Sequence, residues 1–293
     1  MKKIGMVGIG LMGHGIASNL QKHGHALGLF EHPGNQPLAG LKAGGARGFA
    51  SAKELAAASD VVITVLTGSP QVEAVVLGPG GLLEGLRPGS VLIDCSTAVP
   101  SSTVRVAAAV QQAGARFLDA PMTRTPKEAA EGRLNLLVGG DAALLEECRP
   151  VLQCFAENIT HAGPVGAGRR FRDQRDHAQR HVVVQQLHAV ARAHRTGVRD
   201  VLGEALQHRP ALLQQRGVAL ERMKPYLLAG DPTGLKFTIA NARKDLDYYN
   251  AMASDAAAAK EIAAAVLSTL EGALAKADTN TFVPELVSIL AAR

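Results

Sequence analysis

Residues 7–13, V-G-I-G-L-M-G, decide the fold of this chain, because they place a glycine pattern between a strand and a helix. The apolar residues 4–7 predict a short strand, and apolar residues repeat at helical spacing from 11 to 20. A glycine pattern in that position is the fingerprint of a dinucleotide-binding βαβ unit. The alternative is a glycine-rich turn without a ligand.

Each glycine of this loop has its own expected role. Gly8 permits the tight turn, Gly10 lets a pyrophosphate approach the backbone, and Gly13 lets the helix and strand pack closely. The helix start also presents unpaired N–H groups and a partial positive charge to the phosphates. The predicted pyrophosphate-binding residues are Gly8, Ile9, Gly10, Leu11, Met12 and Gly13.

Glu31 is the acidic residue expected at the end of the second strand, A-L-G-L-F-E. It follows Gly13 by 18 positions, near the spacing at which a carboxylate meets the ribose hydroxyls of the adenosine. Because a carboxylate there repels a 2′-phosphate, NAD is the favoured cofactor and NADP is the alternative, with His32 weakening the discrimination. Leu66, at the end of the apolar stretch 61–66, completes the expected cofactor site.

The composition is typical of a globular chain with an aliphatic core. The 293 residues suffice for one large domain or two, and they are 47% hydrophobic but only 3% aromatic. Cys95, Cys148 and Cys154 are odd in number and match no metal-binding spacing. We therefore expect reduced thiols, no metal site and a cytoplasmic location, and no stretch is apolar enough to predict a membrane span.

The net charge of +5 is concentrated in one segment. Residues 169–181, R-R-F-R-D-Q-R-D-H-A-Q-R-H, hold five Arg and two Asp, which gives +3 of the +5. The rest of the chain is close to neutral and has no aromatic residues interleaved with a basic stripe, so a nucleic-acid partner is not expected. His177, His181 and His188 share a helical face, but the adjacent arginines oppose a metal ion and no carboxylate or thiolate ligand is evident.

Strand and helix patterns alternate in residues 1–162, whereas only helical patterns follow in 163–293. The alternation predicts a parallel, doubly wound Rossmann-type sheet with helices on both faces. The second part predicts an all-helical domain for substrate binding and oligomerisation. The expected strands include 4–7, 61–66, 91–94, 117–119, 134–138 and 159–161, and the expected helices include 101–113, 183–205 and 256–277.

Polar residues follow two of these strands, at the carboxyl edge where open α/β sheets bind ligands. Ser96 and Thr97 come after the strand 91–94, and their hydroxyls could bind a carboxylate; the alternative is an N-cap and turn. Thr123 and Arg124 come after the strand 117–119. Arginine recognises carboxylate or sulfonate with a forked geometry, although an arginine on a loop is more often only solvated.

Five ordered motifs resemble the 3-hydroxyisobutyrate dehydrogenases of the β-hydroxyacid dehydrogenase family. They are G-I-G-L-M-G-H-G-I-A-S-N-L-Q-K-H-G-H, D-C-S-T, D-A-P-M-T-R-T, G-P-V-G-A-G and R-K-D-L. The resemblance implies NAD(P)-linked oxidation of a small 3-hydroxy acid, or reduction of its semialdehyde, by a homodimer or homotetramer. It places Ser96 and Thr97 near substrate and nicotinamide, Thr123 at the substrate, and Lys244 at both substrate and cofactor.

Three residues depart from the family pattern. Arg124 replaces a glycine, which is similar to the sulfolactaldehyde reductases and suggests a substrate with a second anionic group. Arg172 stands where the family has its catalytic lysine, and Asp176 stands where it has an asparagine. Arginine stays protonated above pH 12, so Arg172 is a poor proton donor but can still stabilise an oxyanion.

These departures leave several interpretations open. Arg172 is the expected catalytic residue and Asp176 a substrate-binding candidate of an impaired dehydrogenase, in which Lys244 partly replaces the missing donor. A non-catalytic NAD(P)-binding oligomerisation module is one alternative, and an imine reductase is another. A short out-of-frame stretch within 169–181 would also explain a segment with so few apolar residues.

Overall fold

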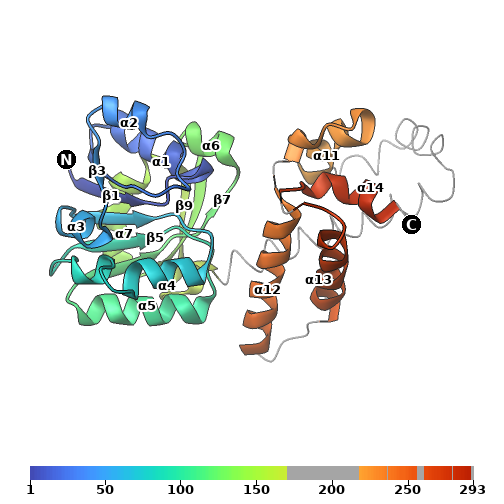
Figure 1. Ribbon diagram of the computed structural model, residues 1–293. Coiled ribbons are helices and arrows are strands. Elements are labelled where there is room, and N and C mark those ends of the chain that lie inside the picture. The colour runs from blue at the N-terminus through green and yellow to red at the C-terminus, as the bar shows by residue number, and fades with distance from the viewer. Residues whose placement is uncertain (170–217, 236, 256–260, 279, 292–293) are drawn as a thin grey trace. The chain divides into compact units, whose positions relative to one another are not determined.

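The computed structural model describes residues 1–169, 218–235, 237–255, 261–278 and 280–291 (Figure 1). By the contacts of its backbone the chain forms two compact units, Met1–Gln174 and Arg175–Arg293. The division lies within residues that the structure does not describe, so the boundary expected between 162 and 163 stays a prediction.

The first unit contains the predicted doubly wound sheet. Six strands are parallel and lie in the order β3-β2-β1-β4-β5-β6, in which the chain reverses its direction of travel between β1 and β4. Such a reversal is where sheets of this class bind ligands. The six strands are β1 Lys3–Val7, β2 Ala26–Phe30, β3 Arg47–Phe49, β4 Val61–Thr64, β5 Val91–Asp94 and β6 Arg116–Asp119.

The sequence analysis expected a parallel sheet throughout, and this expectation is wrong beyond β6. β8 (Leu134–Gly140) is antiparallel to both β6 and the two-residue β7 (Met122–Thr123), whereas β9 (Ala156–Gly163) is parallel to β8. The connection from β6 to β8 carries only β7 and the short helix α6 (Pro126–Ala130). It has no helix long enough to cover a face of the sheet, as a parallel crossover requires.

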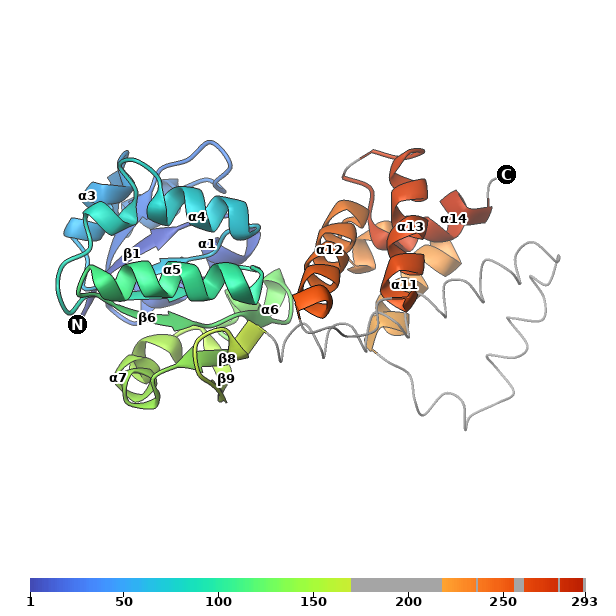
Figure 2. The same ribbon diagram turned by 90° about the horizontal axis from the view of Figure 1, so that it is seen from below.

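Helices cover both faces of this sheet (Figures 1 and 2). One face packs on α1 (Leu11–Lys22), α6 and α7 (Ala142–Leu152), and the other packs on α3 (Ala52–Ala57), α4 (Ser69–Leu77) and α5 (Pro100–Gln112). Side chains alternate between the faces, with Ile4 and Met6 in the first core and Val7 in the second. The short α2 (Ala39–Ala43) follows β2.

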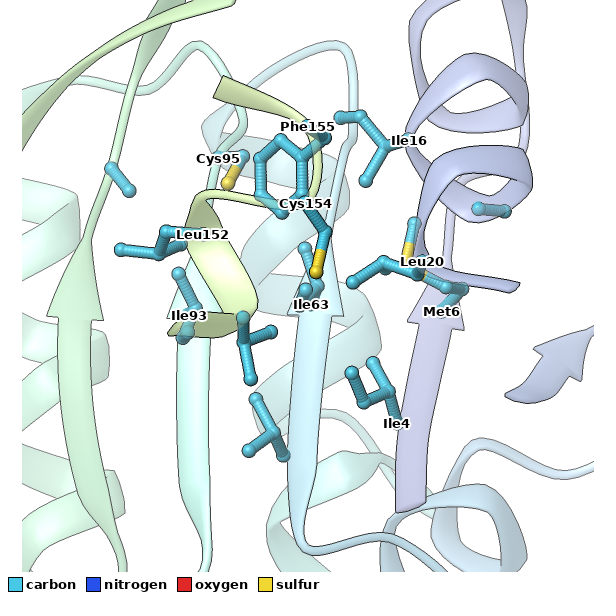
Figure 3. Close-up of a cluster of buried hydrophobic side chains, with 14 of the residues drawn as sticks. Ile4, Met6, Ile16, Leu20, Ile63, Ile93, Cys95, Leu152, Cys154 and Phe155 are labelled. Carbon is cyan, nitrogen blue, oxygen red and sulfur yellow. The ribbon is translucent and has the colours of Figure 1, made fainter. Parts of the chain in front are cut away.

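The first core is aliphatic with one large aromatic ring, as the composition predicts. Figure 3 shows Phe155 among Ile16, Leu20, Ile63 and other apolar side chains of this core. All three cysteines are buried and unbridged. Burial raises the pKa of Cys148 to about 11, so its thiol is protonated at neutral pH.

The described part of the second unit is helical, as expected. It comprises α11 (Val218–Ala229), α12 (Ile239–Asp255), α13 (Glu261–Leu274) and α14 (Leu286–Ala291), around a core that includes Ile239, Leu246 and Leu270. The helix expected over 256–277 corresponds to α13, and the helical segments expected over 183–205 lie outside the described residues. None of the described helices is both long and apolar enough to cross a membrane.

Candidate functional site

The glycine loop between β1 and α1 has the geometry that the fingerprint predicts. Gly8 has a φ of +85°, and a Cβ there would lie 2.2 Å from the Val65 carbonyl oxygen. A Cβ on Gly13 would lie 2.0 Å from the carbonyl oxygen of Gly8. Both positions therefore require glycine for the fold itself, whether or not a ligand is bound.

Gly10 differs from these two glycines because the fold does not require it. It is the N-cap of α1 with φ −79° and ψ −158°, a conformation open to any residue, and a Cβ there would meet nothing within 4 Å. No side chain caps α1, and its first turn contains no acidic residue. The uncapped amides and the open space beside Gly10 fit a pyrophosphate, and Leu11 and Met12 follow directly in this turn.

Asn35 joins this loop to the segment after β2, and sequence analysis missed it. Its side-chain oxygen accepts a hydrogen bond from the Ile9 amide at 3.1 Å, and its side-chain nitrogen donates to the Phe30 carbonyl at 2.9 Å. The backbone of Gln36 also donates to the Ile9 carbonyl at 2.7 Å. Asn35 and Gln36 therefore hold the loop in place through the backbone of Ile9, whose amide already has a protein partner.

Glu31 lies directly after β2, beside the glycine loop, as predicted. Its backbone amide donates to the Phe49 carbonyl on β3 at 2.9 Å. Its carboxylate forms an ion pair with Lys42 of α2, and a Cβ on Gly48 would lie 2.0 Å from the same carboxylate oxygen. The carboxylate thus lies over a glycine of β3 and beside an ammonium group, neither of which sequence analysis had singled out.

Leu66 and Ser96 connect the ends of β4 and β5. The Leu66 amide donates to the Ser96 hydroxyl at 2.9 Å, and a Cβ on Gly8 would lie 3.1 Å from the Leu66 side chain. Ser96 is only 1% exposed, so its hydroxyl is part of the interior of the unit. Thr97, the next residue, is half-buried. The structure therefore brings Leu66 against the glycine turn and places Thr97 at the accessible end of this loop.

A buried cluster of charges lies at the ends of β5 and β6. Asp94 and Asp119 are paired residues of the two strands, and both are almost fully buried. The Arg169 guanidinium, 1% exposed, forms an ion pair with Asp94 and donates to the Ser96 carbonyl. The hydroxyl of Thr64 and the amide of Ser96 also donate to Asp94, at 2.8 and 3.0 Å.

Asp119 anchors the G-P-V-G-A-G motif at residues 163–168. Its carboxylate accepts a hydrogen bond from the backbone amide of Gly166 at 2.7 Å. Burial raises the pKa of Asp119, and the nearby Arg169 partly opposes that rise. A Cβ on Gly168 would lie 2.0 Å from the Leu137 carbonyl oxygen, which explains the last glycine of this motif.

Sequence analysis did not single out Arg169, the first residue of the segment 169–181 with its few apolar residues. The signal that could have found it is the pair of strands V-L-I-D and R-F-L-D, which both end in aspartate. Two neighbouring buried carboxylates need a compensating cation, because an isolated buried charge is costly.

Thr123 and Arg124 lie at the expected edge but have protein partners. Thr123 is buried, and its hydroxyl accepts from the Asn135 side chain at 3.2 Å. The Arg124 guanidinium binds Glu157 and the Arg133 carbonyl. Arg124 also has a φ of +85°, a conformation that favours glycine, which is the residue that the resembling family has at this position.

The described structure does not test the positions of three predicted site residues relative to this edge. Arg172 and Asp176 lie outside the described residues. Lys244 lies on α12 of the second unit, where its ammonium is 3.4 Å from a carboxylate oxygen of Asp245 and 5.8 Å from the ring centre of Tyr248. Their roles therefore stay predictions.

Comparison with known proteins agrees with this geometry. The profile of the NAD-binding domain of 6-phosphogluconate dehydrogenase matches residues 3–163. The chain is 41% identical over 168 residues to the NAD-dependent L-serine dehydrogenase of Pseudomonas aeruginosa, which covers 57% of this chain and 56% of that protein. It is 40% identical over 170 residues to the 3-hydroxyisobutyrate dehydrogenase of the same organism, with the same coverage.

A solved structure extends the similarity beyond the matched sequence. The 3-hydroxyisobutyrate dehydrogenase of Mycobacterium tuberculosis, determined with L-serine, is 26% identical, covers 100% of both chains and has a TM-score of 0.76. The sequence matches to the two curated relatives span little more than half of their length. The resemblance to the 3-hydroxyisobutyrate dehydrogenases is therefore confirmed, and the first unit is an NAD(P)-binding domain. Since the profile covers more than half of this chain, the protein belongs to the family of the NAD-binding domain of 6-phosphogluconate dehydrogenase.

Proposed function

We propose that this protein is an NAD(P)-dependent oxidoreductase that interconverts a small 3-hydroxy acid and its semialdehyde. The observation that carries the proposal is the glycine loop, in which Gly8 and Gly13 are required by the fold whereas Gly10 leaves open space at an uncapped helix start. This arrangement suits a pyrophosphate, and the reversal of strand order between β1 and β4 lies beside it.

The relatives support the substrate class. Serine and 3-hydroxyisobutyrate both carry a primary alcohol on the carbon next to the one that bears the carboxylate. We propose that the substrate shares this carboxylate and alcohol, with Thr97 and Thr123 near its acid group. Arg124 would serve a second anionic group, which requires its guanidinium to leave Glu157.

The chain's own residues would position the cofactor and the substrate next to each other. NAD(P), when bound, would supply the hydride acceptor for the carbon that carries the alcohol. The amides of Leu11 and Met12 would hold the pyrophosphate, Glu31 would accept from the ribose hydroxyls, and Leu66 would exclude water from the nearby face. Ser96 would act by fixing the loop that presents Thr97, because its own hydroxyl is buried.

The alcohol proton needs a base, and this is where the chain departs from its family. We propose that Arg172 stabilises the developing alkoxide by its charge, with Asp176 beside the substrate, and that Lys244 takes the proton. Loss of general acid–base catalysis typically costs about 10²–10⁴ in rate. Lys244→Ala is therefore expected to lower kcat by about a hundredfold or more. Equal turnover by this variant would overturn the role of Lys244.

Binding and turnover together test the proposed function. NADH and NADPH binding would be titrated by fluorescence, and NAD⁺- or NADP⁺-dependent oxidation would be followed with 3-hydroxyisobutyrate, L-serine and 3-hydroxy acids carrying a second anionic group. Turnover of one of these acids is expected. NADH binding without turnover of any hydroxy acid would favour a non-catalytic module, and reduction of a cyclic imine instead would favour an imine reductase.

We also propose that the protein is a homodimer or homotetramer assembled through its helical unit. Light scattering of the full chain would measure its mass, and a monomer at micromolar concentration would contradict this.

A further inference from the structure

The end of β2 carries an ion pair that bears on the choice between the two cofactors. The Glu31 carboxylate, expected at the adenosine ribose, contacts the Lys42 ammonium of α2. Both side chains are nearly half exposed, 42% for Glu31 and 46% for Lys42. An ion pair that is this exposed contributes little to stability, so a ligand can separate the two groups at little cost.

The backbone on both sides of this pair is held in place. Glu31 donates its amide to the Phe49 carbonyl, and Gly48 leaves room for its carboxylate. The residue before Lys42, Leu41, is buried, and its carbonyl accepts a hydrogen bond from Gln21 of α1 at 2.9 Å. Lys42 can therefore change partner by moving only the end of its side chain.

A 2′-phosphate would meet both members of this pair. It carries a charge of about −2 at neutral pH, as phosphate monoesters do. The Glu31 carboxylate would repel it. The Lys42 ammonium contacts that carboxylate, so it would attract a phosphate bound beside Glu31. Arg47, a second cation nearby at the start of β3, has its guanidinium carbon 4.8 Å from the centre of the Phe49 ring, so it is already engaged with that ring.

We propose that Lys42 is a specificity-determining residue, which stays on Glu31 when NAD is bound and moves to the 2′-phosphate when NADP is bound. The chain would then accept both cofactors in spite of the acidic residue at the end of β2. This inference rests on the proposed cofactor binding, and it adds which residue sets the preference and in which direction.

Titration of NADH and NADPH with the full chain tests the inference. The measured quantity is the ratio of the NADPH Kd to the NADH Kd for the unmodified protein, Lys42→Met, Lys42→Arg, Glu31→Gln and Lys22→Met. Lys22 is the matched control, since it is an exposed lysine at the end of α1 in the same unit. Adenosine 5′-monophosphate and adenosine 2′,5′-bisphosphate repeat the comparison without the nicotinamide.

Lys42→Met is expected to raise the ratio about tenfold, which is the size of one charge-assisted hydrogen bond at a partly exposed site. Lys42→Arg and Lys22→Met are expected to leave the ratio nearly unchanged, and Glu31→Gln is expected to lower it. Added salt should reduce the effect of Lys42→Met, because the contact is screened.

The outcomes separate this inference from the proposed function. An unchanged ratio in Lys42→Met, with NADH still bound, would overturn the role of Lys42 and leave the proposed function standing. Failure of the unmodified chain to bind either cofactor would overturn both. If Lys42→Met lost both cofactors by misfolding, an unchanged ratio in Glu31→Gln would still contradict the pair as the determinant.

Discussion

Two stretches of the carboxyl edge of the same sheet, which we call the β1–β2 end and the β5–β6 end, differ in how open and how charged they are. At β1 and β2 the site consists of glycines, backbone amides and an exposed ion pair, and it leaves space beside Gly10. At β5 and β6 the edge consists of Asp94, Asp119 and Arg169, which are buried and hydrogen-bonded to one another or to nearby backbone. The first end leaves room for the cofactor that we propose to bind there, whereas the second end holds the neighbouring loops through buried contacts.

From this difference we expect the β5–β6 end to contribute mainly to stability and the β1–β2 end mainly to cofactor binding. A change at Gly10 removes no contact of the folded chain, whereas a change at Arg169 leaves buried carboxylates without their cation. We therefore expect substitutions at the β5–β6 end to act first on folding, and substitutions in the open part of the β1–β2 end to act first on cofactor affinity.

Arg169→Met is expected to have the largest effect on stability. Removing one partner of a buried ion pair costs about 3–5 kcal/mol, because the other charge remains buried. Denaturant unfolding of the full chain would measure the loss. Arg133→Met is the control, since the Arg133–Glu131 pair is exposed and solvent screens it, so its removal is expected to change stability little. Equal, small losses in both variants would mean that the two ends do not differ as described.

Asp119→Asn tests the buried β5–β6 end through the pH dependence of its stability. The pKa of Asp119 is raised above 3.8 in the folded chain, so the folded state binds this proton more readily than the unfolded state does. Proton binding by Asp119 therefore contributes most to stability at low pH, and this contribution is lost as the pH rises through the raised pKa. The asparagine cannot titrate but can still accept from Gly166.

The stability of Asp119→Asn relative to the unmodified protein is thus expected to improve between pH 4 and pH 7. Urea unfolding at both values measures it. A relative stability that worsened over this range would show that the carboxylate is favoured by its partners, contrary to its burial.

Arg124→Gly is expected to have the smallest effect. Relief of the positive φ is worth about 1–2 kcal/mol, whereas the greater freedom of glycine in the unfolded chain costs about 0.5–1 kcal/mol. Loss of the exposed pair with Glu157 costs little more, because solvent screens that pair. The net change in unfolding free energy is expected to stay within about 1 kcal/mol. A loss of more than 2 kcal/mol would show that the Glu157 contact outweighs the strain.

The two ends also differ in how far the sequence predicts them. The glycine loop, the strands around it and the position of Glu31 depend on neighbouring residues, and sequence reasoning placed them correctly. Arg169, Lys42 and Asn35 act through partners 75, 11 and 26 positions away, and such pairs form only once the sheet has assembled. The antiparallel β8 was missed for a related reason, because strand direction depends on the length and course of its connection.

Arg124 shows an intermediate case. Its departure from the family's glycine was visible in the sequence, but the φ of +85° that makes glycine suitable there appears only in the fold. A contact with substrate and a contact with Glu157 predict the same residue type, so the sequence could not distinguish them.

The most direct test of the central claim is the affinity of Gly10→Val for NADH, measured by fluorescence titration together with its thermal stability. Because the Gly10 backbone suits any residue and its surroundings are open, the unfolding free energy is expected to change by less than about 1 kcal/mol. The side chain would occupy the space for the pyrophosphate, so NADH affinity is expected to fall at least about tenfold, the loss of roughly one good contact. A stable Gly10→Val protein that binds NADH as tightly as the unmodified chain would contradict the assignment of this loop as the cofactor site.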